Sequence, residues 1–229
     1  MPIPPPDHEA LIAKLQTLPI LRGLERAGLE QLAQSAVRRT YTPGAVIFLE
    51  GDPAPVLYYV DAGWVKVVKM ALDGREQILY FWGPGELFGG IFVNRPAPAT
   101  AIALEATTLW SLPRDAICQM VTANPALALP VIEFMAERLS ELIELVADLS
   151  LHTVTTRLAR LLLEQAEGDV VQRQRWATQT EMAARLGTVP DVLSRALREL
   201  VANDLIELAR HQIRILDRQG LAAKATPSR

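Results

Sequence analysis

The stretch from Pro125 to Ser150 constrains the fold of this chain more than any other, because its apolar residues recur at intervals of three and four. Asn124 is a good N-cap and Pro125 suits the first helical position, so the pattern predicts a long helix with a defined start. Its apolar face is wider than one neighbour needs, and parts of it repeat every seven residues, as in a coiled coil. We expect a dimer seam that contains Met135, Leu142, Leu145 and Leu149. A helix packed only on its own domain would show the same periodicity.

Length and composition favour two domains joined by this helix. The chain has 229 residues, 50% of them hydrophobic and 21% charged, which is typical of a globular protein. We expect an N-terminal domain over residues 1–124, the long helix over 125–151 and a C-terminal domain over 152–229. The start is polar and proline-rich, and no apolar run reaches the length of a membrane span, so we expect a cytoplasmic protein that contacts no membrane.

The N-terminal domain changes its periodicity at Thr42. Before it, residues 8–18 and 25–36 have helical spacing, whereas the following segments are short and rich in β-formers. The expected strands are 46–49, 56–60, 64–70, 77–82, 100–104 and 107–112. Asp73-Gly74 lies between two alternating runs and predicts a tight hairpin turn. Strands at this spacing predict an antiparallel β-roll of the jelly-roll type, and hence an α+β protein.

After the expected strands of the roll, the rest of the chain combines helices with short strands. Pro113-Arg114-Asp115 opens a short helix before the long one, and another helix is expected over 153–167. The remaining expected elements are one or two strands within 170–176, helices 179–186 and 190–203, strands 205–209 and 212–216, and a last turn of helix.

The most specific motif is TQTEMAARLGTVPDVLSRALREL, residues 178–200. Apolar residues on its first half, Gly187 at a turn, and leucines on its second half match two helices that cross closely. The inner face is expected to contain Met182, Ala183, Leu186, Leu193, Leu197 and Leu200. Thr188 and Asp191 have the spacing of a capping box around Pro190. With the hairpin that follows, the motif predicts a winged helix-turn-helix, a shape that also occurs in proteins that do not bind DNA.

The outward face of the second helix carries the chemistry of base recognition. Arg195 can donate two hydrogen bonds to guanine, while Asp191 can accept one from cytosine and orient the arginine, although it would also serve as a cap partner. Ser194 can donate or accept, and other polar residues are better placed for phosphate. The predicted DNA-binding residues are Gln179, Thr180, Thr188, Asp191, Ser194, Arg195 and Arg198. Residues 152–229 hold 12 basic and 9 acidic residues and are the only positive part of the chain.

From about Leu21 to Leu216 the chain resembles the CRP/FNR superfamily of bacterial transcription regulators. The resemblance includes Gly51-Asp52, YYVDAGWVKV, GPGELFGG, the long helix and the winged helix-turn-helix. Asp191 to Arg195 match the Ser-Arg recognition helix of FNR-like members, with Asp in place of the usual Glu. The resemblance implies an effector-controlled sensor in the β-roll and a homodimer on a pseudo-palindromic operator. The implied partners are double-stranded DNA, a second copy of the chain, and RNA polymerase.

At the effector positions this chain departs from the members of the superfamily that bind cyclic AMP, so we do not expect cyclic AMP as the effector. Members that bind it hold the ribose with a Glu and the phosphate with an Arg, and these positions are Gly90 and Ala99 here. The adenine-facing positions are Leu142 and Ile143, and Arg95 is the only nearby cation in the sequence. The expected effector pocket is Gly85, Glu86, Leu87, Phe88, Gly89, Gly90, Arg95, Thr100, Leu142 and Ile143.

Other effectors are weighed in the same way. The family's iron–sulfur sensors need four thiolates, whereas the chain has only Cys118. Haem stays open, because Pro2 matches a haem ligand of the family's carbon monoxide sensors, although His8 is the only histidine in the sensor half. An aromatic cluster either lines a cavity or forms the core of the roll. Its residues are Trp64, Phe81, Trp82, Phe88, Phe92 and Trp110.

An enzyme is not expected. A β-roll enzyme would hold a metal with clustered histidines and carboxylates, and the strands carry no such cluster; no serine nucleophile motif or phosphate loop occurs either. The alternative that stays open is a constitutive DNA-binding or interaction protein of the same fold, without a small-molecule effector.

Overall fold

The computed structural model describes residues 6–53, 56–89, 96–172, 174 and 176–226. These residues form two compact units. The first consists of Met1–Val68 with Tyr80–Glu141, and the second of Lys69–Leu79 with Leu142–Arg229. Each unit is described separately.

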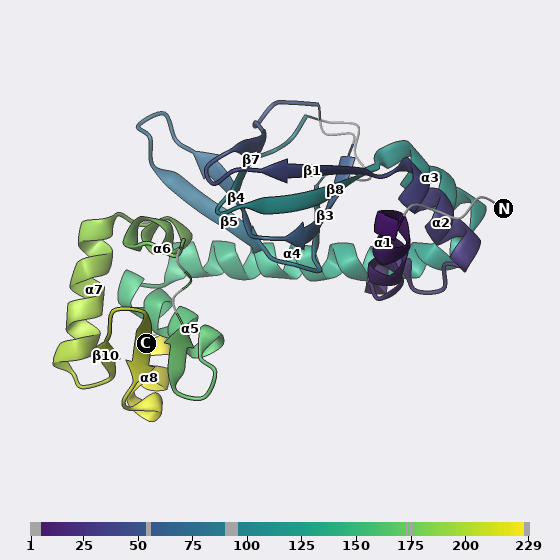
Figure 1. Cartoon of the computed structure of the whole chain (residues 1–229). Helices are drawn as coiled ribbons and strands as arrows, with labels where there is room; N and C mark the ends of the chain where they lie inside the picture. Colours follow the sequence, from purple (N-terminus) through teal and green to yellow (C-terminus); the bar gives the residue numbers. More distant parts are fainter. Residues whose placement is uncertain (1–5, 54–55, 90–95, 173, 175, 227–229) are drawn as a thin grey trace. The chain divides into compact units, whose positions relative to one another are not determined.

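An antiparallel β-roll dominates the N-terminal half (Figure 1). Its strands are β1 (Val37–Tyr41), β2 (Val46–Phe48), β3 (Val56–Ala62), β4 (Val65–Met70), β5 (Glu76–Trp82), β6 (Leu87–Gly89), β7 (Thr100–Ala103) and β8 (Thr107–Pro113). One sheet has the order β1-β8-β3-β6 and the other β2-β7-β4-β5. The roll and its α+β class are therefore confirmed.

The hairpin between β4 and β5 turns where the sequence predicts it. Gly74 has a φ of +82°, a conformation that glycine adopts without steric cost. The Ala71 amide donates to the Arg75 carbonyl at 2.8 Å, which closes the turn.

Two strands were not expected from the sequence. β1 has no buried residue, and β6 has only three residues within a glycine-rich segment. Both are paired along their length, β1 with β8 and β6 with β3. Their hydrogen bonds come from partners distant in sequence, so local propensity did not reveal them.

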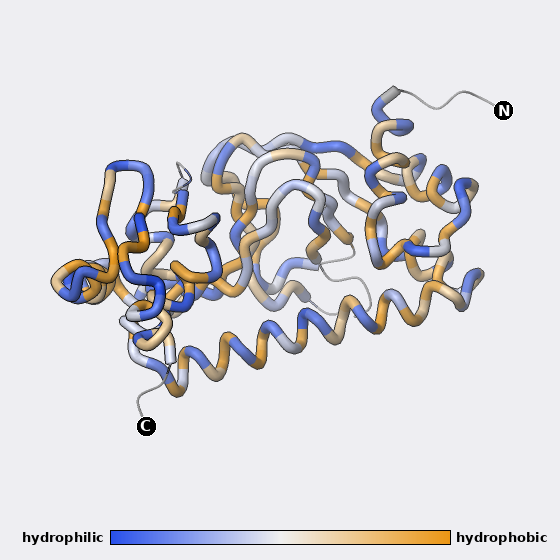
Figure 2. The backbone as a smooth tube through the Cα atoms, turned by 90° about the horizontal axis from the view of Figure 1, so that it is seen from below, coloured by the Kyte–Doolittle hydropathy of each residue, from blue (hydrophilic) through white to orange (hydrophobic). Residues whose placement is uncertain are grey.

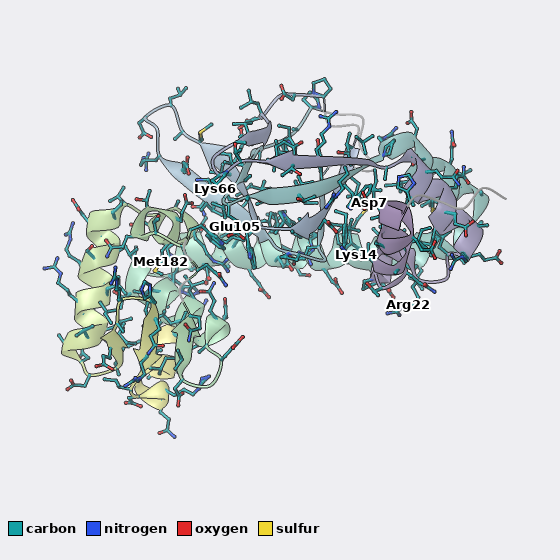
Figure 3. All side chains as sticks on the ribbon, in the orientation of Figure 1. Asp7, Lys14, Arg22, Lys66, Glu105 and Met182 are labelled. Atoms are coloured by element: carbon teal, nitrogen blue, oxygen red, sulfur yellow. The ribbon has the colours of Figure 1, made fainter. Side chains whose placement is uncertain are left out.

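Three helices cover one end of the roll (Figure 1). They are α1 (Pro6–Gln16), α2 (Arg26–Ser35) and α3 (Arg114–Ala123), with the short 3-10 helix η1 (Pro19–Leu21) between the first two. Their apolar faces share a core with Leu57, Trp110 and Leu112 of the sheet. Lys14, labelled in Figure 3, forms an ion pair with Asp61, and Arg38 lies 3.6 Å from the same carboxylate.

The long helix begins one turn later than predicted. Asn124 caps the 3-10 helix η2 (Pro125–Leu127) by accepting a hydrogen bond from the Ala126 amide at 3.3 Å. The α-helix α4 then runs over Ala128–Leu151. No single helix among the described residues is long and apolar enough to cross a membrane; only α3 taken together with Pro125–Leu151 passes by length and composition, and this pair is bent by 111°.

The second unit contains the predicted winged helix-turn-helix. Its elements are α5 (Val154–Gln165), β9 (Val170–Gln172), α6 (Gln179–Arg185), α7 (Pro190–Ala202), β10 (Ile206–Leu208), β11 (Gln212–Ile215) and α8 (Arg218–Ala225). The three strands pair in the order β10-β11-β9. All six predicted inner-face residues belong to one core, in which Met182 (Figure 3) is half-buried and the other five are buried.

The predicted capping box at the start of α7 is wrong. The N-cap is Val189, and no side chain caps the helix there. Pro190 occupies the first turn, and the residue before a proline is held extended, so Val189 becomes the boundary. Thr188 instead lies in the turn, where its amide donates to the Ala183 carbonyl at 2.9 Å.

Candidate nucleic-acid interface and effector cleft

Helix α7 separates a buried face from an exposed polar face. Leu193, Leu197 and Leu200 are buried in the core of the second unit. On the opposite side Arg195 and Arg198 are exposed. This division follows from the 3.6-residue period of the helix and leaves the polar side chains accessible to a partner.

Both arginines on the exposed face lie along their own helix. The Arg195 Nε donates to the Asp191 carbonyl at 3.5 Å, and the Arg198 Nε donates to the Ser194 carbonyl at 3.2 Å. The predicted orientation of Arg195 by the Asp191 carboxylate is therefore not what this structure has, because the contact is to the backbone. Asp191 is exposed and Ser194 is half-buried.

The other predicted DNA contacts lie on α6 and in the turn. Gln179 and Thr180 are exposed in the first turn of α6, which Thr178 caps by accepting from the Glu181 amide at 3.2 Å. Thr188 is half-buried between the two helices. The seven predicted residues thus fall on α6, the turn and the part of α7 from Asp191 to Arg198.

The turn of the motif packs against the end of the long helix. Gly187 has a φ of +62°, and a Cβ at this position would collide with the side chain of Leu149. The same end of α4 is held by α5, because Arg157 donates to the Leu149 carbonyl at 3.3 Å and Arg160 pairs with Asp148. The last turn of α4 is therefore part of the second unit's packing.

Helix α4 also carries an exposed apolar stripe. Figure 2 shows hydrophobic and hydrophilic residues alternating along the helix. The exposed apolar residues at alternating spacings of three and four are Ile132, Met135, Leu139, Leu142 and Val146, between 37% and 61% accessible. Of the predicted seam, Met135 and Leu142 lie on this stripe, whereas Leu145 and Leu149 are half-buried within the chain. Ile132, Leu139 and Val146 were missed, although their heptad spacing was readable.

A neighbouring side of α4 faces a cleft in the first unit. The cleft has a volume of about 230 Å³. Among the described residues it is lined by Phe48, Val67, Tyr80, Trp82, Leu87, Phe88, Gly89, Ala97, Pro98, Ala99, Phe134 and Arg138. Strands β2, β4, β5 and β6 supply one part of the lining, residues 97–99 another, and α4 the last two residues.

Stacked rings form the apolar part of the cleft. Trp82 stacks on Tyr80 with centroids 5.2 Å apart and on Phe88 at 6.2 Å. Behind Phe88 lies Tyr58, with ring centroids 5.1 Å apart. Burial raises the pKa of the Tyr80 phenol above its ordinary value, and the nearby Glu141 carboxylate adds to this shift. The Tyr80 hydroxyl therefore stays protonated at neutral pH, and it donates to the Arg138 carbonyl at 3.2 Å.

Arg138 is the charged residue of the described cleft lining. Its guanidinium carbon lies 5.1 Å from the ring centroid of Trp82 and 5.4 Å from that of Phe134. One terminal nitrogen pairs with Glu141 at 2.9 Å. The buried Nε has no hydrogen-bond partner within the described part of the chain.

Three of the ten predicted pocket residues line the cleft, namely Leu87, Phe88 and Gly89. Gly85 and Glu86 lie in an exposed turn, where the Glu86 carboxylate accepts from the Gly83 amide at 2.5 Å. Thr100 is buried and accepts from the Glu50 amide at 3.0 Å. Of the other four predicted pocket residues, Leu142 and Ile143 are exposed on α4 and are not part of the lining. Gly90 and Arg95 lie outside the described residues.

The sequence pointed to only part of the cleft. Trp82 and Phe88 belong to the aromatic cluster noted in the sequence, whereas Trp110 packs in the core shared with the N-terminal helices. Tyr80, Phe134 and Arg138 were missed. Phe134 and Arg138 are four residues apart, so they share a helix face, and this spacing was the available signal.

Of the residues considered for haem, His8 does not line the cleft. His8 on α1 packs against Trp110 with ring centroids 5.9 Å apart and is absent from the described lining. Pro2 lies outside the described residues. Within the described ranges, no group of three or more His, Cys, Asp or Glu side chains is arranged to hold a metal ion.

Comparison with known proteins identifies both halves of the chain. Residues 38–124 match the Cyclic nucleotide-binding domain, and residues 156–224 match the Crp-like helix-turn-helix domain. The CRP-like cAMP-activated global transcriptional regulator of Mycobacterium tuberculosis is 29% identical over 214 residues, covering 90% of this chain and 96% of that protein. The Cyclic AMP receptor protein of Thermus thermophilus is 31% identical over 200 residues, covering 83% and 88%. FixK2 from Bradyrhizobium japonicum has a similar fold, with a TM-score of 0.75 and 24% identity over 85% of this chain and 99% of that one.

Proposed function

The chain belongs to the CRP/FNR family of transcription regulators, and from this premise we propose that it is a homodimeric, sequence-specific DNA-binding regulator controlled by an effector in the β-roll cleft. The observation that carries the proposal is the exposed polar face of α7, which has Arg195 and Arg198 opposite a buried leucine face. The relatives are transcription regulators and not enzymes, as the sequence led us to expect.

In this proposal α7 enters the major groove of double-stranded DNA. Arg195 donates to guanine, and Asp191 and Ser194 contact neighbouring base edges. Gln179 and Thr180 at the N-terminus of α6, Thr188 in the turn, and Arg198 bind phosphates and set the orientation of the motif. In this proposal residues 1–124 bind the effector, residues 125–151 form the dimer and residues 152–229 bind DNA.

The stripe on α4 is proposed to pair with the same stripe of a second chain. Five apolar side chains at coiled-coil spacing are exposed on one helix, and burying them supplies the main driving force for pairing. A two-fold pair presents two recognition helices to half-sites about one helical turn apart, as a pseudo-palindromic operator requires. Leu145 and Leu149 then support the seam from its edge.

Helix α4 is proposed to couple ligand binding in the cleft to the arrangement of the DNA-binding motif. Phe134 and Arg138 line the cleft, Leu139 and Leu142 lie on the stripe, and Leu149 contacts the turn of the DNA-binding motif. A ligand that binds one arrangement of α4 more tightly than another shifts the population of DNA-binding dimers. The regulator acts in the cytoplasm, where its operator and RNA polymerase are present.

Cyclic AMP is not the proposed effector, although two relatives are named for it. The phosphate-binding Arg of cyclic-AMP-binding members is Ala99 here, and this methyl group lines the cleft. A phosphate without its arginine loses a charge-assisted interaction of about 1.5–3 kcal/mol.

Selection of bound DNA from a random duplex pool tests the proposal. The full chain should enrich a pseudo-palindrome with half-sites about 10 base pairs apart. Enrichment of a single half-site would contradict the proposed dimer, and a pool without enrichment would contradict sequence-specific DNA binding.

A further inference from the structure

We infer that the β-roll cleft binds a small aromatic carboxylate, with its ring against the aromatic side chains of the lining and its carboxylate on Arg138. This inference rests on the proposed role of the cleft as the effector site and adds the chemical class of the ligand. Four properties of the cleft support it: its size, its walls, its charge and the geometry of Arg138.

The size of the cleft selects a small ligand. Its volume of about 230 Å³ lies below the range of about 300–1,000 Å³ that is usual for pockets holding drug-sized molecules. A single aromatic ring with one acidic substituent suits this space better than a nucleotide or a macrocycle.

The walls of the cleft select an aromatic body. Trp82, Tyr80 and Phe88 have ring planes within 28° of their stacking neighbours, so they form a continuous surface of similar orientation. Phe134 of α4 adds a further ring to the lining. A flat ring stacked on such a surface gains both burial of apolar area and offset aromatic contacts.

The charge of the cleft selects an anion. Its described lining contains one positively charged residue, Arg138, and no Asp or Glu. The other polar group is the Tyr80 hydroxyl, which already donates to the Arg138 carbonyl. Of the two, only the guanidinium is left to attract a charged ligand.

The geometry of Arg138 suits a ligand carboxylate. The rings of Trp82 and Phe134 hold the guanidinium in place, which lowers the entropy that binding would cost. Its Nε is buried without a hydrogen-bond partner among the described residues, and a carboxylate can pair with Nε and a terminal nitrogen together. The present pair with Glu141 is partly exposed, at 44% for the glutamate side chain, so its loss costs little.

Calorimetric titration of the full-length protein tests the inference, with benzoate, 4-hydroxybenzoate and phenylacetate as probes. At least one should bind and quench part of the tryptophan fluorescence, through Trp82. Benzamide has the same ring without the charge and should bind at least tenfold more weakly. Equal binding of benzamide, binding of cyclic AMP instead, or no binding by any of the three acids would overturn the inference.

Two variants of the arginine pair give different expectations. Arg138→Gln should weaken binding of the best probe by about tenfold to a hundredfold. Glu141→Gln removes the competing carboxylate, keeps the arginine and should leave binding equal or tighten it by up to about fivefold. This second variant keeps the inference testable if Arg138→Gln fails to fold, since a weaker affinity would contradict it. Arg22→Gln, at an exposed arginine outside the lining, is the matched control and should change nothing.

Operator binding is measured on the same preparation, so that the two proposals fail separately. DNA binding without any response to the acids refutes the ligand and leaves the DNA-binding regulator. Binding of benzoate without DNA enrichment supports the chemistry of the cleft and refutes the regulator.

Discussion

The recognition motif and the cleft differ in how far their residues are spread along the chain. All seven proposed DNA contacts lie between Gln179 and Arg198, on two short helices and one turn. The cleft collects side chains from Phe48 to Arg138, through several strands, a connecting segment and a helix. A site within one supersecondary motif follows from local periodicity, whereas a site assembled by tertiary packing does not.

The largest effect is expected from a substitution in the exposed stripe of α4, which should abolish DNA binding and leave the cleft unaffected. Leu139→Glu places like charges in an apolar seam, at a cost of about 3–5 kcal/mol to the dimer. Sedimentation should show a single subunit, and operator affinity should be lost while the cleft keeps its ligand affinity. Leu142→Glu should act in the same way.

Ser140→Glu provides the control for the stripe, because Ser140 is exposed on α4 but lies outside the apolar series. It should leave the dimer intact. If Leu139→Glu also stays dimeric, α4 is not the seam.

Within the recognition motif, Arg195→Ala should weaken the free energy of binding to the preferred operator by about 1–3 kcal/mol and relax the preference at one base pair. Arg198→Ala should weaken all sequences alike and reduce the salt dependence of binding, because its proposed partner is a phosphate. Repeating the DNA selection with each variant distinguishes the two roles. An unaltered preference in Arg195→Ala would contradict the docking.

The junction between α4 and the turn offers a matched glycine pair. Gly187 and Gly168 both have a φ of +62°, but only at Gly187 would a Cβ meet another side chain. Replacement by alanine should cost about 1–2 kcal/mol at each position from backbone strain. Gly187→Ala should lower the free energy of unfolding by about 1 kcal/mol more, because the side chain of Leu149 must move. Denaturant unfolding measures the difference, and equal losses would show that the turn and α4 are not tightly packed.

The smallest effect is expected from the tyrosine of the cleft. Burial raises the pKa of Tyr80 in the folded state. The contribution of Tyr80 to the free energy of unfolding is therefore fully present below the ordinary pKa of about 10 and is lost as pH rises above it. Unfolding followed between pH 9 and 11.5 should show a steeper alkaline loss of stability in the unaltered protein than in Tyr80→Phe. Identical profiles would show that the phenol is freely solvated.

Much of the fold followed from patterns within single segments. The alternating runs, the Asp73-Gly74 turn and the leucine spacing of the helix-turn-helix led to elements that the structure confirms. Strands β1 and β6 did not, because their pairing partners β8 and β3 lie far away in the sequence. The capping box failed because the steric effect of Pro190 on Val189 outweighed a side-chain pattern.

The sequence by itself determined which face of each helix is apolar, because a helical period converts residue spacing directly into position around an axis. It therefore located the leucine core of the recognition motif and the presence of an apolar series on α4. Only the tertiary structure decided which part of that series stays exposed, and that Arg138 meets Trp82 from a distant strand. Such contacts depend on how separate segments pack, and no local period encodes them.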